Sequence, residues 1–496
     1  MDNKNAIDTA YKKEKRRKII LMLLFVVSFL SFAMLTFILL KYSILPTKMR
    51  FTGIISLIVI YVLLQIIIST ARITRIKFSI IAFILILLLV FQLLVFMYLN
   101  KGVSIFDRIG QKQGSESITY SLVVNKDSSY QTIDDVGSTE VSAALETDGR
   151  NIRTFLEKFK KSNNKSISLK EGGQFIVMAK DLLDKKTEII LFNEGHRAVV
   201  EEQLPEFSEN TRVLQEVNFE TEKVNPQKAS HVEYEAPFNV YISGIDTYGS
   251  LSTVARTDVN LVLSINPTTR KILITSIPRD TYMPIAGGGN NQGDKLTHSG
   301  IYGIEASIET LENFLDTDIN YYARVNFNSL IRVVDILGGI NVQNDRSFSA
   351  FNGDYFESGD IYLTGERALT FSRERKNLPG GDNDRGKNHI KVIEGIIKKA
   401  LSPSILFNYN SLMDEMYNSM DTNMPTSKLI ELINAQIENN KSWSFDNAVI
   451  EGYPSMSLPS YAMPGWELYM TDPSQESIDS VQSQIKSTLS ISNQTE

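Results

Sequence analysis

Three long apolar runs near the start of the chain constrain its fold more than any other feature. The runs cover residues 19–40, 51–70 and 78–98, and none contains an ionisable side chain other than tyrosine. Each run is long enough to cross the roughly 30 Å hydrocarbon core of a bilayer as a helix. A buried helix of a soluble domain normally keeps a polar stripe, which these runs lack. We therefore predict three transmembrane helices within residues 19–98.

Basic residues predict how these helices are oriented. Six Lys and Arg residues lie between positions 12 and 18, and three more lie between positions 72 and 77. Cytoplasmic segments carry an excess of such residues, so we place residues 1–18 in the cytoplasm and the chain after residue 98 outside. The connection between the first two runs is also basic, but the N-terminal cluster is denser. A cleavable signal peptide has a shorter apolar run, so we expect a multi-pass protein of the cell membrane.

Charge and cysteine content exclude several classes of function. The formal net charge is -6, and a nucleic-acid partner would require a basic field that attracts phosphates. We therefore expect no nucleic-acid partner. The chain has no cysteine, which excludes disulfides, thiol catalysis and metal sites built on cysteine.

Residues 105–220 alternate short strand-like and helix-like patterns. Residues 121–125 and 187–193 are strand-like, 151–161 is helix-like, and 174–183 is a short apolar segment. This alternation predicts a small accessory α/β domain without a catalytic constellation. Its lone His196 is interpreted as an ordinary exposed histidine.

A linker and a larger domain are predicted to follow. Residues 221–235 contain few aliphatic side chains, which indicates a linker. Residues 236–490 then switch repeatedly between the periodicity of a strand and that of a helix. Strand patterns cover residues 237–246, 260–267 and 271–280, and helical spacing recurs over 304–315, 330–337 and 390–401. Interleaved strands and helices predict an extracellular α/β domain with a mixed sheet covered by helices.

Charged residues collect at the starts and ends of these predicted elements. They are Asp246, Arg256, Asp258, Arg279, Asp280, Arg373, Arg375, Asp382, Asp384 and Arg385. Arginine forks match phosphate oxygens, and the interleaved aspartates could hold a divalent cation that bridges to the phosphates. Viewed singly, each residue is more simply a surface charge. As a set they predict a pyrophosphate site with Mg²⁺ on Asp246 and Asp258.

Local patterns around these residues give four further expectations. Arg373 and Arg375 would project to one side of an extended strand. Asp384 would cap a helix opened by Arg385. The segment at 287–294, GGGNNQGD, lacks the ending of a phosphate-binding loop and predicts a flexible loop. Lys295 and His298 would touch a ligand or form a plain surface turn.

Seven segments together resemble a known family. They are SGIDTYG, RTDVNLVLSINP, ITSIPRDTYM, KLTHSGIYG, VNFNSLIRVVDILGGI, LTGERALTFSRERK and GGDNDRGKNHIKVIEGI. In order and spacing they resemble the LytR-CpsA-Psr family over residues 238–400. The three spans and the accessory domain further resemble its capsule-biosynthesis branch, the CpsA- or Wzg-like membrane proteins of Gram-positive bacteria.

The resemblance implies a function and a set of site residues. Such a domain binds a polyprenyl-pyrophosphate-linked glycan with Mg²⁺ (or Mn²⁺) and transfers the glycopolymer, here capsular polysaccharide, to cell-wall peptidoglycan as a phosphotransferase. The matched positions are Arg256, Arg279, Arg373, Arg375, Arg385 and His389 for the pyrophosphate, Arg279, Arg375 and Asp382 for catalysis, and Asp246 and Asp258 for the metal. His389 stands where the family commonly has glutamine. The proton acceptor is left open between Asp382 and Asp258, and Asp382 could instead only orient an arginine.

Two functions from other classes remain open. One is a membrane-bound regulator or attenuator of capsule expression, although a cytoplasmic segment of about 18 residues without a DNA-binding motif argues against direct control of transcription. The other is a non-catalytic lipid-glycan binding protein that modulates capsule synthesis. Membrane lipid and other capsule-assembly membrane proteins are further expected partners.

Overall fold

The computed structural model describes residues 2–42, 47–112, 115–222, 236–245, 254–402, 411–412, 414–415, 419–439 and 441–490. Contacts divide the chain into two units, Met1–Gly110 with Pro425–Lys441, and Gln111–Met424 with Ser442–Glu496. The predicted linker at 221–235 lies outside the described residues apart from its first two positions.

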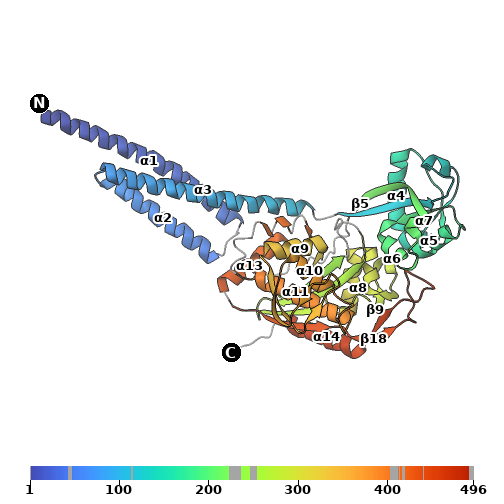
Figure 1. The fold of residues 1–496 in the computed structure, drawn as a ribbon. Coiled ribbons are helices and arrows are strands. Elements are labelled where there is room, and N and C mark those ends of the chain that lie inside the picture. Colours follow the sequence, from blue (N-terminus) through green and yellow to red (C-terminus); the bar gives the residue numbers. More distant parts are fainter. Residues whose placement is uncertain are drawn as a thin grey trace. The chain divides into compact units, whose positions relative to one another are not determined.

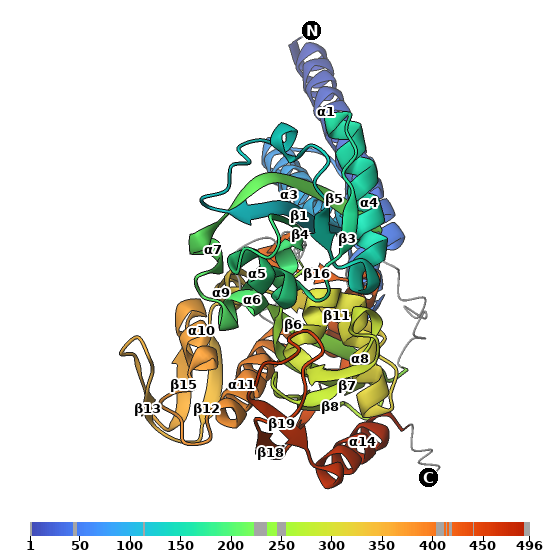
Figure 2. The ribbon, with the colours of Figure 1, turned by 90° about the vertical axis from the view of Figure 1, so that its right-hand side faces the viewer.

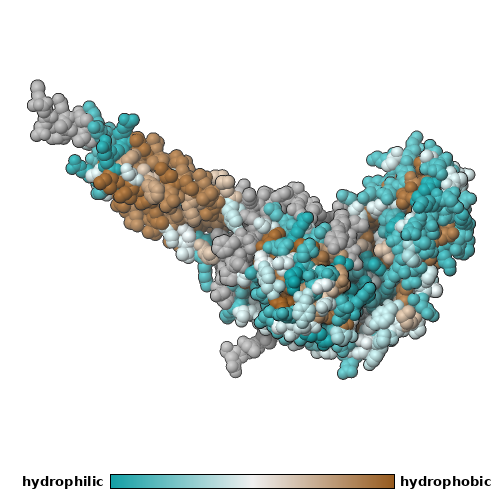
Figure 3. All heavy atoms as spheres, in the orientation of Figure 1, coloured by the Kyte–Doolittle hydropathy of each residue, from teal (hydrophilic) through white to brown (hydrophobic). Residues whose placement is uncertain are grey.

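The first unit is helical. It consists of α1 (Asp2–Tyr42), α2 (Thr47–Thr70), α3 (Arg75–Lys112) and α13 (Thr426–Asn439), labelled in Figure 1. The first three contain apolar spans at 11–41, 47–70 and 75–99 that are long enough to cross a membrane. Their surface is predominantly hydrophobic in Figure 3. The three predicted helices are therefore confirmed, and α1 and α3 extend well beyond their apolar runs.

A buried polar cluster joins these three helices. Gln92 of α3 donates to the Tyr61 hydroxyl of α2 at 2.8 Å, and Tyr61 donates to the backbone carbonyl of Ser28 in α1 at 2.9 Å. Polar groups within an apolar span favour partners on neighbouring helices, because lipid offers none. The cluster therefore fixes how the three helices pack against one another.

The second unit begins with the accessory domain. Its sheet has the order β3-β2-β4-β1-β5. The strands are β1 (Ser115–Asn125), β2 (Val141–Ala143), β3 (Leu169–Glu171), β4 (Ile189–Asn193) and β5 (Thr211–Glu222), and the helices are α4 (Leu145–Asn163), α5 (Phe175–Leu183), α6 (Arg197–Gln203) and α7 (Phe207–Asn210). Phe175, Met178, Ala179 and Leu182 bury one face of α5 at helical spacing. The region is α/β, as predicted.

The larger domain is built on a six-stranded sheet of order β16-β11-β6-β7-β8-β17. Its strands are β6 (Phe238–Ile245), β7 (Thr257–Asn266), β8 (Lys271–Ser276), β11 (Tyr321–Val325), β16 (Asp421–Thr422) and β17 (Ser444–Val449). β6 pairs with β11 in parallel and with β7 in antiparallel orientation, so the sheet is mixed, as predicted. Figure 2 shows β6, β7 and β8 beside one another in this sheet.

Helices cover both faces of this sheet. They are α8 (Ile304–Leu315), α9 (Phe327–Ile336), α10 (Gly365–Arg373), α11 (Asp382–Ala400) and α14 (Gln475–Leu489). Side chains alternate along β6, so Tyr241 packs in a core with Leu311 of α8 and Ile485 of α14. The next residue, Ile242, faces the side of α9, α10 and α11.

Smaller elements connect these layers. β9 (Tyr282–Ile285) pairs with β10 (Gln292–Lys295), and β12 (Ile340–Asn344) pairs with β15 (Gly359–Leu363). β13 (Phe348–Ser349) pairs with β14 (Tyr355–Phe356), and β18 (Gly452–Ser455) pairs with β19 (Met470–Pro473). The short 3-10 helices are η1 (Ile133–Val136), η2 (Glu194–His196), η3 (Gly287–Gly289) and η4 (Leu296–Tyr302).

Several local predictions are wrong. Arg373 ends helix α10, so it and Arg375 do not share an extended strand. Helix α11 begins at Asp382, two residues before the predicted cap. The backbone geometry at the cap decides at which residue a helix begins or ends. The side-chain pattern predicts that position only to within a few residues.

Burial also corrects the sequence interpretation. Residues 287–294 form a 3-10 turn and part of strand β10 rather than a featureless loop. His196 is only 4 % exposed and stacks on Phe175, so it is not a surface histidine. His298 is fully buried and Lys295 nearly so, which excludes a plain surface turn at these positions. Burial through partners distant in sequence leaves no local pattern.

Candidate functional site

A cavity of about 440 Å³ lies between the sheet and helices α9, α10 and α11. Much of its wall is apolar, with Ile242, Val259, Leu330, Leu369 and Val392 among the lining residues. The same cavity is lined by Asp258, Arg279, Arg373, Arg375, Arg385 and His389. The structure thus brings six of the predicted site residues to one apolar cavity.

A β-bulge aims Asp258 into this cavity. The register between β6 and β7 pairs Gly244 with Val259 and Ile245 with Thr257, which leaves Asp258 as the extra residue. Thr257 bonds to Tyr241 on the packed face of the sheet, whereas Asp258 and Val259 both line the cavity. A regular strand would place neighbouring side chains on opposite faces. The bulge therefore adds a carboxylate to an otherwise apolar stretch of wall.

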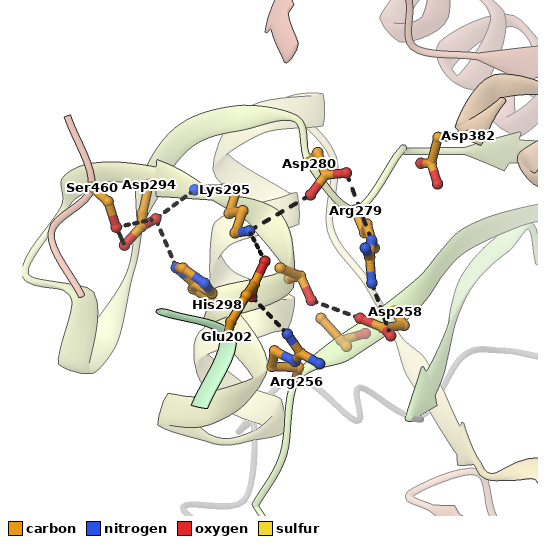
Figure 4. Close-up of polar contacts among 12 residues, drawn as sticks. Glu202, Arg256, Asp258, Arg279, Asp280, Asp294, Lys295, His298, Asp382 and Ser460 are labelled. Carbon is orange, nitrogen blue, oxygen red and sulfur yellow. Dashed lines mark hydrogen bonds and ion pairs between the residues drawn. The ribbon is translucent and has the colours of Figure 1, made fainter. Parts of the chain in front are cut away.

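Asp258 is held as a carboxylate by two partners. It accepts a hydrogen bond from Arg279 at 3.1 Å and one from Thr297 at 3.0 Å (Figure 4). Burial raises the pKa of Asp258, but the charges of Arg279, Arg256 and Arg385 outweigh burial, so the pKa lies below its usual value. Asp258 is thus ionised at neutral pH.

Arg279 lies just after strand β8 and is surrounded by carboxylates. Besides Asp258, it has the Asp280 carboxylate at 3.6 Å from its Nε. Burial opposes its charge, but Asp258, Asp280 and Asp382 together raise the pKa of Arg279. The guanidinium is therefore fixed in position and permanently charged, as recognition of a phosphate requires.

Helix α11 contributes Arg385 and His389, one turn apart. Arg385 forms an ion pair with Asp382, three residues earlier on the same helix. Enclosure, and then the nearby Arg385 charge, lower the pKa of His389 to about 3. His389 is therefore neutral at physiological pH, and its ring also hydrogen-bonds to the Ser372 backbone, which orients it at the cavity.

The end of helix α10 contributes Arg373 and Arg375. Arg373 lies over the Phe327 ring, 4.2 Å from its centroid. Between the two arginines, the buried Glu374 carboxylate accepts hydrogen bonds from the backbone N–H groups of Phe351, Arg375 and Asn377 at 2.6, 2.9 and 2.9 Å. Glu374 thus fixes the turn that presents Arg375. Among the described residues, the Arg375 guanidinium has no hydrogen-bond or ion-pair partner, so it is available to a ligand.

Arg256 is placed differently from the other predicted arginines. It does not line the cavity, and its Nη1 lies 2.9 Å from Glu202 of the accessory domain. Lys295 lies 3.4 Å from the same carboxylate and 3.9 Å from Asp280 (Figure 4). An alternating chain of charges therefore runs from Glu202 to Arg279.

The predicted metal site is described only in part. Asp246 lies outside the described residues, and no group of three or more metal-ligating side chains occurs among those that are described. Mg²⁺ typically uses one or two carboxylates together with phosphate oxygens of its ligand. The ionised Asp258, which faces the cavity beside arginines, fits that requirement from the protein side.

These features together suit an amphiphile with an anionic head. Apolar walls can take a hydrocarbon chain, because burying its surface is favourable by about 25 cal/mol per Å². The guanidinium groups that line the cavity can take two or more phosphate charges, each through charge-assisted hydrogen bonds of about 1.5–3 kcal/mol.

Comparison with known proteins identifies the family. The sequence model of the LytR_cpsA_psr family matches residues 206–486, which is more than half of the chain. The chain belongs to the LytR_cpsA_psr family. A model of DNA polymerase processivity factor matches residues 77–192, less than a quarter of the chain, and does not show membership in that family.

Relatives of this LytR_cpsA_psr protein include named transferases. The polyisoprenyl-teichoic acid–peptidoglycan teichoic acid transferase TagU of Bacillus anthracis is 34% identical over 229 residues, which cover 46% of this chain and 74% of the relative. The Enterococcus faecalis protein of the same name is 36% identical over 209 residues, covering 42% and 68%. The crystal structure of B. subtilis TagU is 30% identical and covers 51% of this chain and 97% of that chain, with a TM-score of 0.41.

Sequence reasoning missed three contributors to the site of this LytR_cpsA_psr protein. Glu374 accepts hydrogen bonds from three backbone N–H groups, and these contacts depend on the turn after α10. Thr297 and Glu202 reach the site from distant parts of the chain. Of the three, only Glu374 has a signal in the sequence, because it lies between Arg373 and Arg375.

Proposed function

We propose that this protein transfers a polyprenyl-pyrophosphate-linked glycopolymer to peptidoglycan at the outer face of the cell membrane. The observation that carries this proposal is a cavity that combines apolar walls with four lining arginines. Membership in a family with named polyisoprenyl-teichoic acid–peptidoglycan transferases supports it. The three long apolar helices support attachment to the membrane that holds such a lipid.

In this proposal the apolar wall binds the isoprenoid chain. Ile242 and Val259 of the sheet face Leu330 of α9 and Val392 of α11 across the cavity. Gly244 lets Val259 pack closely beside it in this wall, because a Cβ at position 244 would lie 2.7 Å from the Cβ of Val259. The chain of the lipid would bury apolar surface here and so direct its head group to the arginines.

The head group would then be held by Arg279, Arg375 and Arg385, with Arg373 and the neutral His389 beside them. Arg256, which is paired with Glu202 outside the cavity, would join them on release from that ion pair. Asp258 and Asp246 are the residues we propose for Mg²⁺. A bound Mg²⁺ would neutralise phosphate charge. The ion pair of Asp258 with Arg279 gives the arginine a fixed orientation toward the phosphates. Such preorganised charge is the main source of rate enhancement in phosphoryl transfer.

The transfer step we propose breaks the pyrophosphate. A hydroxyl oxygen of peptidoglycan attacks the phosphorus that carries the glycan, the P–O bond to the other phosphate breaks, and polyprenyl phosphate leaves. The arginines stabilise the charge that develops on this leaving group. The hydroxyl proton passes to a carboxylate or to water. The Asp382–Arg385 ion pair favours a role for Asp382 in orienting Arg385.

We propose capsular polysaccharide as the glycopolymer and the outer side of the membrane as the place of transfer. The accessory domain between the spans and the larger domain supports the capsule branch of the family. The distribution of basic residues supports a cytoplasmic N-terminus. Other capsule-assembly membrane proteins remain expected partners.

A reconstituted reaction tests the proposal. The full chain in vesicles is supplied with lipid-linked capsular glycan, Mg²⁺ and isolated peptidoglycan, and the measured quantity is glycan that stays on peptidoglycan after lipid extraction. We expect transfer by the wild type and release of one polyprenyl phosphate for each chain attached. Binding of the lipid without transfer would instead favour the non-catalytic binding protein. If the protein neither binds the lipid nor transfers the glycan, the proposal is overturned, and the regulator becomes the better explanation.

A further inference from the structure

The accessory domain inserts a carboxylate beside the proposed head-group site. Glu202 lies in helix α6 of the accessory domain, in the same unit as the larger domain. Its Oε2 lies 2.9 Å from Arg256 Nη1, and its Oε1 lies 3.4 Å from Lys295 Nζ. Figure 4 shows Glu202 pointing toward both cations. One carboxylate thus pairs with two cations from two different segments of the larger domain.

The two cations it binds differ in what they can do. The Lys295 side chain is 5 % exposed and also lies 3.9 Å from Asp280, so it is enclosed among carboxylates. Arg256 lies two residues before Asp258, yet it does not line the cavity that Asp258 lines. Its charge nevertheless helps to lower the pKa of Asp258, so Arg256 lies close to the head-group site while its guanidinium is directed toward the accessory domain.

Glu202 has the charge needed to compete with a phosphate. Burial raises the pKa of Glu202, but Lys295 and Arg256 outweigh burial and lower the pKa, so the side chain is ionised at neutral pH. A carboxylate and a phosphate oxygen use the same faces of a guanidinium. The Glu202 carboxylate and a phosphate oxygen therefore cannot accept a hydrogen bond from the same N–H of Arg256 at the same time.

We infer that Glu202 sets the affinity of the head-group site by holding Arg256 in an ion pair that a bound pyrophosphate must exchange for its own. This inference rests on the proposed function and describes how the same site is regulated. Because coupling between two binding events is reciprocal, docking of α6 weakens head-group binding, and head-group binding loosens the contact of α6. The position of the accessory domain would then depend on whether the head-group site holds a lipid.

The inference predicts a gain of affinity, which loss of structure would not produce. Geranyl diphosphate serves as a soluble probe of the head group, and its binding to the full chain in detergent is measured by calorimetry with Mg²⁺. We expect Glu202→Gln to tighten binding about threefold, since partly exposed ion pairs contribute modestly. The Glu202 side chain is one-third exposed, so the substitution leaves the core intact.

Matched controls separate this effect from a general change in charge. Glu206→Gln removes the same charge from an exposed position four residues away and should leave binding unchanged. In an Arg256→Ala background, Glu202→Gln should no longer tighten binding, because the exchanged partner is gone. Equal tightening by Glu206→Gln, or persistence of the effect without Arg256, would contradict the inference.

The same measurements distinguish failure of the inference from failure of the proposed function. If wild type binds geranyl diphosphate and Arg375→Ala does not, the head-group site stands. Unchanged or weaker binding by Glu202→Gln would then overturn only the role of Glu202. If geranyl diphosphate binds none of these proteins, the head-group assignment falls, and the inference falls with it.

Discussion

The two faces of the six-stranded sheet differ in how completely they are filled. On one face, Tyr241 and Val262 pack with Leu311 of α8 and Ile485 of α14 in a continuous core. On the other face, the same strands leave a cavity of about 440 Å³ beneath α9, α10 and α11. The strands that stabilise the domain on one side therefore provide a binding wall on the other.

The bulge at Asp258 makes this division sharp. It places Thr257 on the packed face and Asp258 with Val259 on the cavity face. We therefore expect substitutions on the cavity face to change binding and transfer with little change in stability. Substitutions on the packed face should do the opposite.

The largest expected effect is on the cavity face. Arg375→Ala should lower transfer of glycan to peptidoglycan about a hundredfold to a thousandfold, as does loss of one preorganised donor in other enzymes. Arg279→Ala should lower transfer at least as much. Glycan on peptidoglycan is measured in the reconstituted reaction, and thermal unfolding checks the fold.

Arg346→Ala is the matched control. Arg346 is exposed and does not line the cavity, so the substitution removes one positive charge without changing the site. Arg279→Ala leaves Asp258 without its main partner, so Arg375, which has no partner among the described residues, is the cleaner test. Wild-type transfer by Arg375→Ala would remove Arg375 from the site.

A substitution on the packed face should break stability instead. Leu311 is fully buried between β6 and α14, and Leu311→Ala should lower the free energy of unfolding by about 3 kcal/mol, through lost burial and the cavity left behind. Geranyl diphosphate affinity, measured well below the unfolding temperature, should stay within about twofold. A large loss of affinity at unchanged stability would show that the two faces are not separable in this way.

Filling the cavity should separate the lipid chain from its head group. Leu330→Trp on α9 adds volume to the apolar wall, so binding of a long polyprenyl diphosphate should weaken about tenfold. Inorganic pyrophosphate, which has no chain, should bind as to wild type. Leu330→Ala removes volume at the same position and should keep binding of the long lipid within about threefold. Equal weakening for both ligands would place the hydrocarbon chain elsewhere.

Periodicity in the sequence predicted the layers of this fold but not the contacts that complete the site. Ile304, Ile308, Leu311 and Leu315 recur at helical spacing and form the buried side of α8, as expected. Strand patterns likewise predicted β6, β7 and β8. These features could be predicted because each element buries one face, and the spacing of apolar residues in the sequence reflects that face.

The bulge and the contacts between distant residues cannot be predicted from local spacing in the sequence. The extra residue at Asp258 depends on how β7 pairs with β6, and Glu202 meets Arg256 across 54 positions of sequence. The pattern grouped Asp258, Arg279 and Arg385 in one predicted site because each lies near the start or end of a strand or helix. It could not show that Arg256 turns toward the accessory domain.

The smallest expected effect concerns His389, where the family commonly has glutamine. Its pKa of about 3 makes it neutral at pH 7, so His389→Gln should keep transfer within about threefold. The effect on stability depends on pH. An unfolded chain binds a proton at His389 below about pH 6.5, whereas the folded chain does so only near pH 3.

Stability contributed by the neutral ring is therefore fully present above pH 6.5 and is lost as pH falls toward 3. His389→Gln should show a smaller drop in melting temperature between pH 7 and pH 5 than wild type. An unchanged drop would mean that His389 is protonated in the folded protein near its ordinary pKa. It would then be a cation on the cavity face, and it would add to the arginines rather than resemble glutamine.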